Sequence, residues 1–116
     1  MTESMTSVPT TGEAERSRVV DTLRGYAGEL RRRGVRRLRV TGSVARGEAT
    51  PTSDVDLIAE IDRTSVARFS LLDLAALELD LGEVLGRDVQ IVTALDQVHP
   101  IVRANLEAQA IDILDG

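Results

Sequence analysis

Apolar side chains recur with helical spacing in three stretches of this chain. In the first, Glu13–Arg33, they fall three and four residues apart, and Gly34 supplies the glycine with which helices commonly end. The second, Val66–Leu85, is so rich in leucine that its polar side chains form only a narrow stripe. Such a helix is expected to be largely buried or covered by a partner. The third, Pro100–Gln109, begins with a proline at the first helical position.

Shorter apolar runs between these helices predict four strands. They comprise residues 35–42, 54–61, 88–92 and 110–114. In the clearest run, apolar side chains alternate with a second set that includes Asp54 and Asp56, so the two sets face opposite sides of the sheet. The order of helices and strands predicts an α/β fold, in which helices pack on a mixed sheet of about four strands.

Composition places the chain among single-domain globular proteins. Its 116 residues are 42% apolar, enough for one core, and we assign the domain to residues 13–116. Residues 1–12 are rich in Thr, Ser, Pro and Gly and are predicted to be a disordered tail. No apolar run approaches the ~18–20 residues that cross a bilayer. Without a secretory signal or a cysteine, the sequence favours a cytoplasmic protein with no membrane partner.

Charge argues against a nucleic-acid partner. The formal net charge is −5, so the chain has no excess of cations to neutralise nucleic-acid phosphates. Tyr26 and Phe69 are the only aromatic residues, so few side chains could stack on bases. One basic cluster, six arginines within residues 31–39, could be a binding patch for RNA or a protein. The alternative, which we favour, is that these arginines complement a helix C-terminus and occupy solvated strand positions.

A Gly-Ser pair at the end of the first strand is the first candidate for chemistry. The segment "GSVARG", residues 42–47, can form one helical turn after the strand. Free backbone N–H groups at such a turn can hold phosphate oxygens, and Ser43 adds a hydroxyl donor. A Gly-Ser pair after a strand is, taken alone, more commonly just a turn.

Two carboxylates on the next strand make the pattern more specific. Asp54 follows Ser43 by eleven residues, and Asp56 points to the same side of the strand because it is two residues further on. Two like charges side by side are unfavourable unless a cation lies between them. Magnesium is the natural cation for oxygen ligands and substrate phosphates. The plainer interpretation is a loop-end cap followed by an edge-strand charge.

Together these segments resemble a known family. The form "GSVARGEATPTSDVDL" is similar to the Gly-Ser and Asp-x-Asp motif of the DNA-polymerase-beta-like nucleotidyltransferases, and in detail to the minimal nucleotidyltransferases (MNT). Members of that branch typically serve as antitoxins beside HEPN-domain toxin RNases. The resemblance extends over most of the chain, including "LGRDVQIVT" and the ending "HPIVRANLEAQAIDIL".

The resemblance implies a role for each residue of the motif. Gly42 and Ser43 would hold the triphosphate of ATP or another nucleoside triphosphate, and Asp54 and Asp56 would be the catalytic ligands of Mg²⁺. A hydroxyl, in this branch one on the partner toxin, would attack the α-phosphate and release pyrophosphate. Arg46 would brace the turn or reach a phosphate.

One position departs from the family pattern. The family usually carries a third carboxylate on the next strand, and here that third-acid position holds Gln90. Asp88 faces the same side but is displaced by about 6–7 Å along the strand. An amide cannot accept the proton of the attacking hydroxyl. Three hypotheses therefore stand: an adenylyltransferase that modifies its toxin, a degenerate antitoxin that neutralises its toxin by binding alone, and a structural domain that is fused to or assembled with others. The first two predict a hetero-oligomer with the toxin.

Overall fold

The computed structural model describes residues 10–61, 71–93 and 100–114. Four strands form one sheet in the order β3-β2-β1-β4. Their bounds are β1 Val35–Thr41, β2 Val55–Ile61, β3 Val89–Val92 and β4 Ile111–Leu114. β1 pairs antiparallel with β2 and with β4, whereas β2 and β3 run parallel. The mixed four-stranded sheet predicted from the sequence is thereby confirmed.

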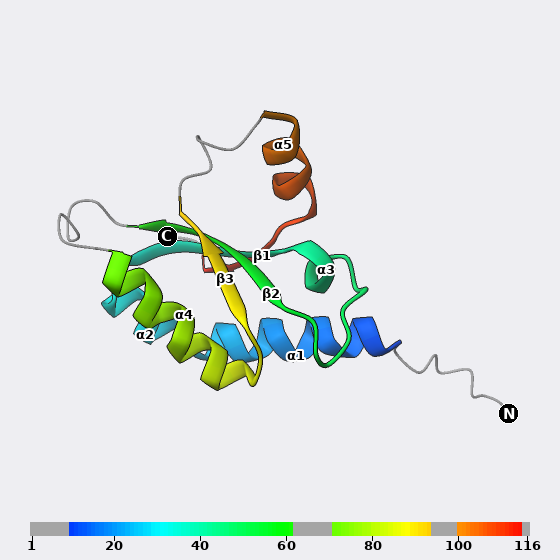
Figure 1. The fold of residues 1–116 in the computed structure, drawn as a ribbon, viewed down its shortest axis with the longest axis horizontal. Helices are drawn as coiled ribbons and strands as arrows, with labels where there is room; N and C mark the ends of the chain where they lie inside the picture. Colours follow the sequence, from blue (N-terminus) through cyan, green and yellow to red (C-terminus); the bar gives the residue numbers. More distant parts are fainter. Residues whose placement is uncertain (1–9, 62–70, 94–99, 115–116) are drawn as a thin grey trace, which may run out of the picture.

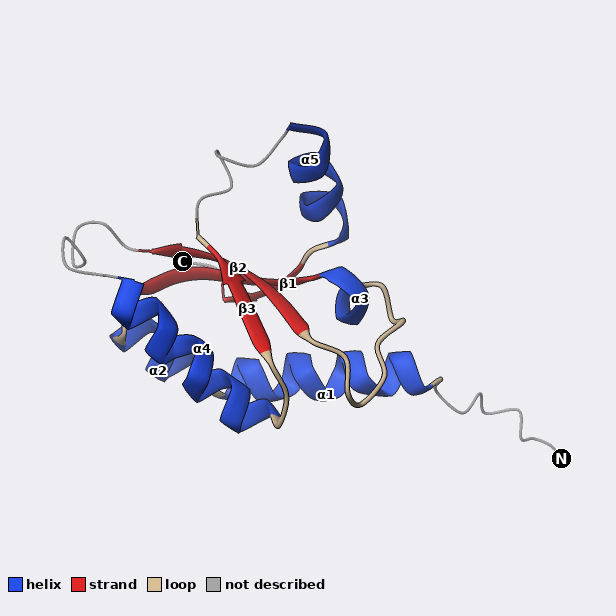
Figure 2. Cartoon of the chain, viewed as in Figure 1, coloured by secondary structure: helices blue, strands red, loops and turns tan. Residues whose placement is uncertain are grey.

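Helices lie on both sides of this sheet. Their bounds are α1 Thr11–Gly25, α2 Ala27–Arg32, α3 Gly42–Ala45, α4 Leu71–Leu85 and α5 Pro100–Gln109. Helices α1, α2 and α4 cover one face, α5 lies on the opposite side, and the short α3 caps one end of β1 (Figures 1 and 2). The predicted helix at Pro100–Gln109 and the helical turn after β1 are confirmed. Residues 66–70, predicted to begin α4, lie outside the described part.

The first predicted helix differs from the structure at both ends of α1. It is two helices, because Tyr26 leaves helical geometry between Gly25 and Gly28, residues of low helix propensity. It also begins earlier than Glu13. The Thr10 hydroxyl accepts a hydrogen bond from the Glu13 N–H (3.1 Å), and the Glu13 carboxylate accepts one from the Thr10 N–H (2.9 Å). This reciprocal cap orders residues 10–12, which the composition alone assigned to the tail.

The main core lies between the sheet and the three-helix layer. Its fully buried side chains come from all of these elements and include Leu23, Leu30, Leu38, Leu57, Leu77 and Leu81. Ile58, on the opposite face of β2, is also only 1% exposed. The central strands are therefore buried on both faces. Among the described residues, no helix combines the length and apolar character needed to span a membrane.

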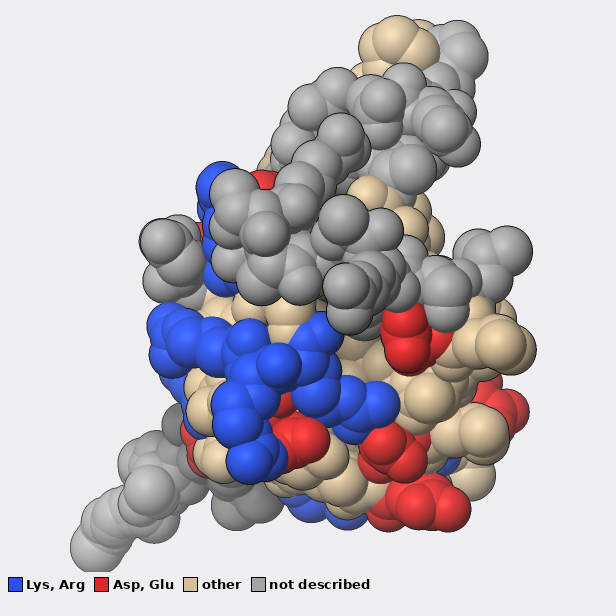
Figure 3. Space-filling model, turned by 90° about the vertical axis from the view of Figure 1, so that its left-hand side faces the viewer, with Lys and Arg blue, Asp and Glu red and all other residues tan. Residues whose placement is uncertain are grey.

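The structure shows the two surfaces that the sequence singled out, the leucine-rich helix α4 and the arginine cluster of residues 31–39. On α4, Leu72 and Leu79 are 82% and 69% exposed, so this helix presents apolar side chains that the described chain does not cover. The arginine cluster forms a broad field at one end of the molecule (Figure 3). Its members pair with Glu29, Asp80, Glu60 and Asp112. These pairs favour the interpretation of ion-paired surface residues, although Arg39 is buried rather than solvated.

Candidate functional site

The candidate site begins at the turn between β1 and α3. Gly42 opens α3 with a φ of +72°, in the left-handed region that favours glycine. A Cβ atom at this position would lie 2.5 Å from Oδ2 of Asp56. Backbone hydrogen bonds from Arg46 to Gly42 (3.1 Å) and from Glu48 to Ser43 (2.9 Å) close the turn. The fold therefore places the Asp56 carboxylate directly against the Gly-Ser turn.

The acidic pair stands where β2 begins. Asp54 is exposed and precedes the strand by one residue, and Asp56 is half-buried within it. Burial raises the pKa of Asp56 above its usual range, the negative charge of Asp54 raises it further, and the positive charge of Arg46 opposes the rise. The folded protein thus holds two carboxylates whose mutual repulsion a cation between them would relieve.

Gln90, and not Asp88, lies beside Asp56. The parallel pairing of β2 with β3 puts Asp56 opposite Gln90 and Val55 opposite Val89. Asp88 precedes β3, and its carbonyl accepts a hydrogen bond from the Val55 N–H (2.9 Å). No strand shift compensates for the amide at position 90. Within the described ranges, no cluster of three or more acidic, His or Cys side chains is arranged to hold a metal ion.

Arg46 links the turn to the helix on the far side of the sheet. Its Nε donates to Oε1 of Glu48 (2.9 Å), and its Nη1 donates to Oε1 of Gln109 in α5 (3.2 Å). The guanidinium is also near enough to Asp56 for its charge to oppose the rise of that pKa. The guanidinium is 41% exposed, so both roles expected from the sequence, bracing the turn and reaching a phosphate, stay predictions.

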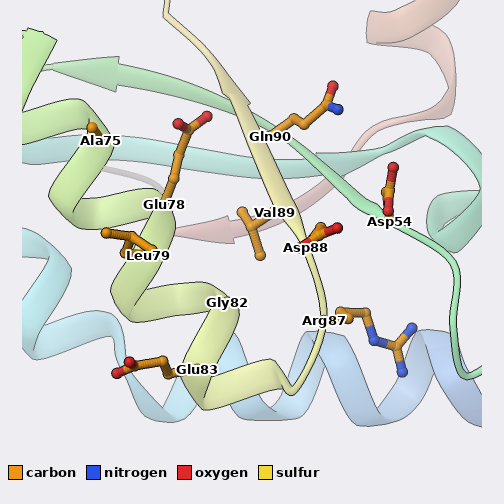
Figure 4. Close-up of a pocket in the computed structure, with 10 residues that line it drawn as sticks. All are labelled: Asp54, Ala75, Glu78, Leu79, Gly82, Glu83, Arg87, Asp88, Val89 and Gln90. Atoms are coloured by element: carbon orange, nitrogen blue, oxygen red, sulfur yellow. The ribbon is translucent and has the colours of Figure 1, made fainter.

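A pocket of about 640 Å³ lies between α4 and β3, and Asp54 of the acidic pair is one of its lining residues. Its lining residues are Asp54, Ala75, Glu78, Leu79, Gly82, Glu83, Arg87, Asp88, Val89 and Gln90. Asp88 and Gln90 extend from β3 toward the side on which Asp54 lies, and Val89 points away from it (Figure 4). Gly42, Ser43 and Asp56 are not part of this lining. The pocket therefore approaches the acidic pair from the side away from the Gly-Ser turn.

Sequence reasoning missed two residues next to the site. Arg87 lies just beyond α4, which ends at Leu85, and its side chain is only 3% exposed. It forms an ion pair with Glu15 of α1, which itself is nearly buried. The pKa of the Glu15 carboxyl is lowered by hydrogen bonds from Arg18 and Arg87. The usable signal was Gly86-Arg87 before a strand, because the glycine, with φ of +71°, ends the helix before the arginine.

The fold and site define a nucleotidyltransferase-type α/β domain, and comparison with known proteins agrees. The family described as "Nucleotidyltransferase domain" matches residues 23–113. This chain belongs to that family. A protein of Methanocaldococcus jannaschii, "Putative protein adenylyltransferase MJ0435", is 38% identical over 85 residues, which cover 73% of this chain and 86% of the relative. A second protein of that organism, MJ0126, bears the same description and is 32% identical over 98 residues, 84% of this chain and 96% of the relative.

Solved structures give the same fold. One described as "Structure of putative minimal nucleotidyltransferase" is 36% identical and has a TM-score of 0.63, covering 90% of this chain and 98% of that protein. A toxin–antitoxin structure with AMP-PNP has a TM-score of 0.60 at 16% identity, covering 87% of this chain and 73% of that one. The resemblance to the minimal nucleotidyltransferases is thus confirmed at the level of family and fold.

Proposed function

We propose that this protein is a Mg²⁺-dependent nucleotidyltransferase of the minimal type. It transfers AMP from ATP to a protein hydroxyl, and it acts as the antitoxin of a HEPN-domain toxin. The contact of Asp56 with Gly42 carries the proposal, because it joins the turn that would hold a triphosphate to the carboxylates that would hold the metal. Relatives described as protein adenylyltransferases support the reaction, and the fold shared with toxin–antitoxin complexes supports the partner.

The side chains present fit a magnesium ion. Asp54, Asp56 and Gln90 offer only oxygen ligands from their carboxylate and amide groups, which is the donor set that magnesium prefers. Burial, and after it the negative charge of Asp54, raise the pKa of Asp56, and a cation held between the two carboxylates would favour their charged forms. Asp54 and Asp56 would hold the ion, which when bound would neutralise charge on the transferring phosphate.

The residues of the chain divide the reaction between them. Ser43 and the backbone of the turn bind the β- and γ-phosphates and orient the α-phosphate toward Asp54 and Asp56. The acceptor enters through the pocket beside β3, on the side opposite the leaving group. A bond forms between the acceptor oxygen and the α-phosphorus, the bond from that phosphorus to the bridging oxygen breaks, and pyrophosphate leaves. The acceptor proton passes to solvent or to Asp88, since the Gln90 amide cannot take it.

A second candidate function follows from Gln90. General-base help is typically worth about 10²–10⁴-fold in rate. A protein without a general base can still bind the nucleotide, while its rate of AMP transfer falls by that factor. In that case the protein is an antitoxin that acts by covering its toxin, with the nucleotide site as a structural or regulatory element.

Calorimetry with ATP in the presence and absence of MgCl₂ tests the binding half of the proposal. Wild type should bind ATP only with magnesium, and Asp54→Asn or Asp56→Asn should abolish the binding. Ser43→Ala should weaken it by roughly 1.5–3 kcal/mol, the value of a hydrogen bond to a charged group. Asp21→Asn, which removes an exposed carboxylate of α1, is the matched control and should change nothing. Binding that persists with chelator or in both Asp variants would refute the metal assignment.

A further inference from the structure

Arg87 is buried at a junction that no assigned role explains. Its side chain is 3% exposed, and it follows Gly86 at the turn from α4 to β3. Its Nε atom is buried and without a hydrogen-bond partner. Buried ion pairs of this kind are often replaceable by apolar side chains without loss of stability. Stability alone is therefore a poor reason for an arginine here.

The contacts of Arg87 lead directly to the candidate metal ligand Asp54. Nη2 pairs with Oε1 of Glu15, and Nη1 donates to the carbonyl of Thr50 (3.3 Å). That same carbonyl accepts a hydrogen bond from the Ser53 N–H (3.0 Å), and the Ser53 hydroxyl accepts one from the Thr50 N–H (2.9 Å). Arg87 thus holds the tight turn from whose end Asp54 projects.

The next residue along the chain fixes the other side of Asp54. The Asp88 carbonyl accepts a hydrogen bond from the N–H of Val55 (2.9 Å). Asp54 therefore lies between two anchored neighbours. Ser53 shares the Thr50 carbonyl with Arg87, and Val55 is bonded to Asp88, and Arg87 and Asp88 are the two residues that precede β3. The same two residues lead into the strand that carries Gln90 opposite Asp56. This junction therefore contacts the backbone on both sides of Asp54 and leads into the strand of Gln90.

We propose that Arg87 is a positioning residue, which sets the Asp54 carboxylate relative to Asp56 without contacting nucleotide. Its guanidinium is buried against Glu15 and the Thr50 carbonyl, so it is directed at the protein and not at a phosphate. The metal part of this inference rests on the proposed function, whereas the effect on the backbone around Asp54 does not. Loss of such an outer-shell contact typically weakens metal binding by about 10–100-fold.

Arg87→Met and Arg87→Lys, compared with Arg33→Met, separate positioning from stability. Arg33, the residue that follows α2, also pairs with a carboxylate of another element, Asp80 of α4 (2.7 Å), and neither of these two residues lines the pocket beside Asp54. Amide hydrogen exchange of the full chain in EDTA gives the metal-free readout. Arg33→Met should change exchange only through global stability. Arg87→Met should accelerate exchange at Ser53 and Val55 beyond the global change, by about tenfold or more. Lysine should restore stability through Glu15 without restoring this protection.

The second readout is a titration with MgCl₂ alone, in which the NMR chemical shifts of the Val55 and Gln90 amides are monitored. The midpoint should rise by about tenfold or more in Arg87→Met and Arg87→Lys and stay unchanged in Arg33→Met. If exchange is altered in the Arg87 variants but wild type binds no magnesium, the positioning role of Arg87 stands and the proposed function is refuted. A folded Arg87 variant, Met or Lys, with ordinary exchange at Ser53 and Val55 would overturn the inference. So would an unchanged midpoint.

Discussion

At the scale of single residues, the candidate site depends on the close approach of the Asp56 carboxylate to Gly42. The left-handed φ of Gly42 and the 2.5 Å approach of Oδ2 are separate constraints, and a side chain at position 42 would violate both. Gly86 shares the first constraint, with φ of +71°, but a Cβ atom there would meet nothing within 4 Å. The two glycines therefore allow the contact to be tested apart from the backbone conformation.

Gly42→Ala should abolish magnesium-dependent ATP binding, whereas Gly86→Ala should leave it intact. Both variants should lose about 1–2 kcal/mol of stability from the left-handed conformation. Only Gly42→Ala also displaces the Asp56 carboxylate. Calorimetry and thermal unfolding of the two proteins provide the comparison. Equal ATP affinity in both variants would show that the turn and Asp56 do not act as one site.

The pH dependence of stability should reveal Asp56 in metal-free buffer. Its raised pKa means that the folded state holds the proton more tightly than the unfolded chain does. As pH rises from the ordinary aspartate range through the raised pKa, stability should fall and then remain lower. Asp56→Asn lacks this loss, so its free energy of unfolding should exceed that of wild type at pH 7, and the difference should shrink at acidic pH. Parallel curves for the two proteins would contradict the raised pKa.

At the scale of elements, the pattern of apolar residues predicted the four strands well, because these strands bury one face or both, and Pro100 marked the start of α5. It could not place the break at Tyr26, because the spacing of apolar residues continues through it. It also missed the start of α1, which depends on the cap at Thr10 and on the packing of Gly12 against the Gly47 carbonyl in the turn after α3. The burial of Arg87 was hidden for the same reason: its partners, Glu15 and Thr50, are far away in sequence.

Gly12→Ala should destabilise the protein, although alanine is the better helix former. A Cβ atom on Gly12 would lie 1.8 Å from the carbonyl oxygen of Gly47, which follows α3. Such overpacking typically costs about 1–3 kcal/mol. Gly25→Ala, in the same helix with nothing within 4 Å, should instead gain about 0.4–1 kcal/mol. Urea unfolding of both variants measures the contrast, and a stabilised Gly12→Ala protein would show that α1 does not pack on this turn.

At the scale of the whole molecule, the apolar face of α4 and the candidate site lie close together. Leu79 both lines the pocket beside Asp54 and is 69% exposed, and Leu72 extends the same helix face. Exposed apolar patches commonly mark sites of protein association. A partner seated on α4 would thereby bring its own hydroxyl groups to the entrance of the pocket.

Leu72→Glu combined with Leu79→Glu should abolish co-elution with the HEPN-domain toxin that we propose as the partner, without loss of ATP binding. Ile101→Glu is the control, since it also replaces an exposed apolar side chain with a carboxylate, but on α5, on the other side of the sheet. Size exclusion after co-expression measures the complex. Retention of the complex by the α4 variant, or its loss only in Ile101→Glu, would place the interface elsewhere.

The central claim is that the Gly-Ser turn, the acidic pair and position 90 form one site for nucleotidyl transfer. Intact mass spectrometry of the co-expressed partner, incubated with ATP and magnesium, tests it most directly. Wild type should add AMP slowly, Asp56→Asn should add none, and Gln90→Asp should add it about 10²–10⁴-fold faster, because the general base is restored. Brisk transfer by wild type that neither substitution alters would contradict the account.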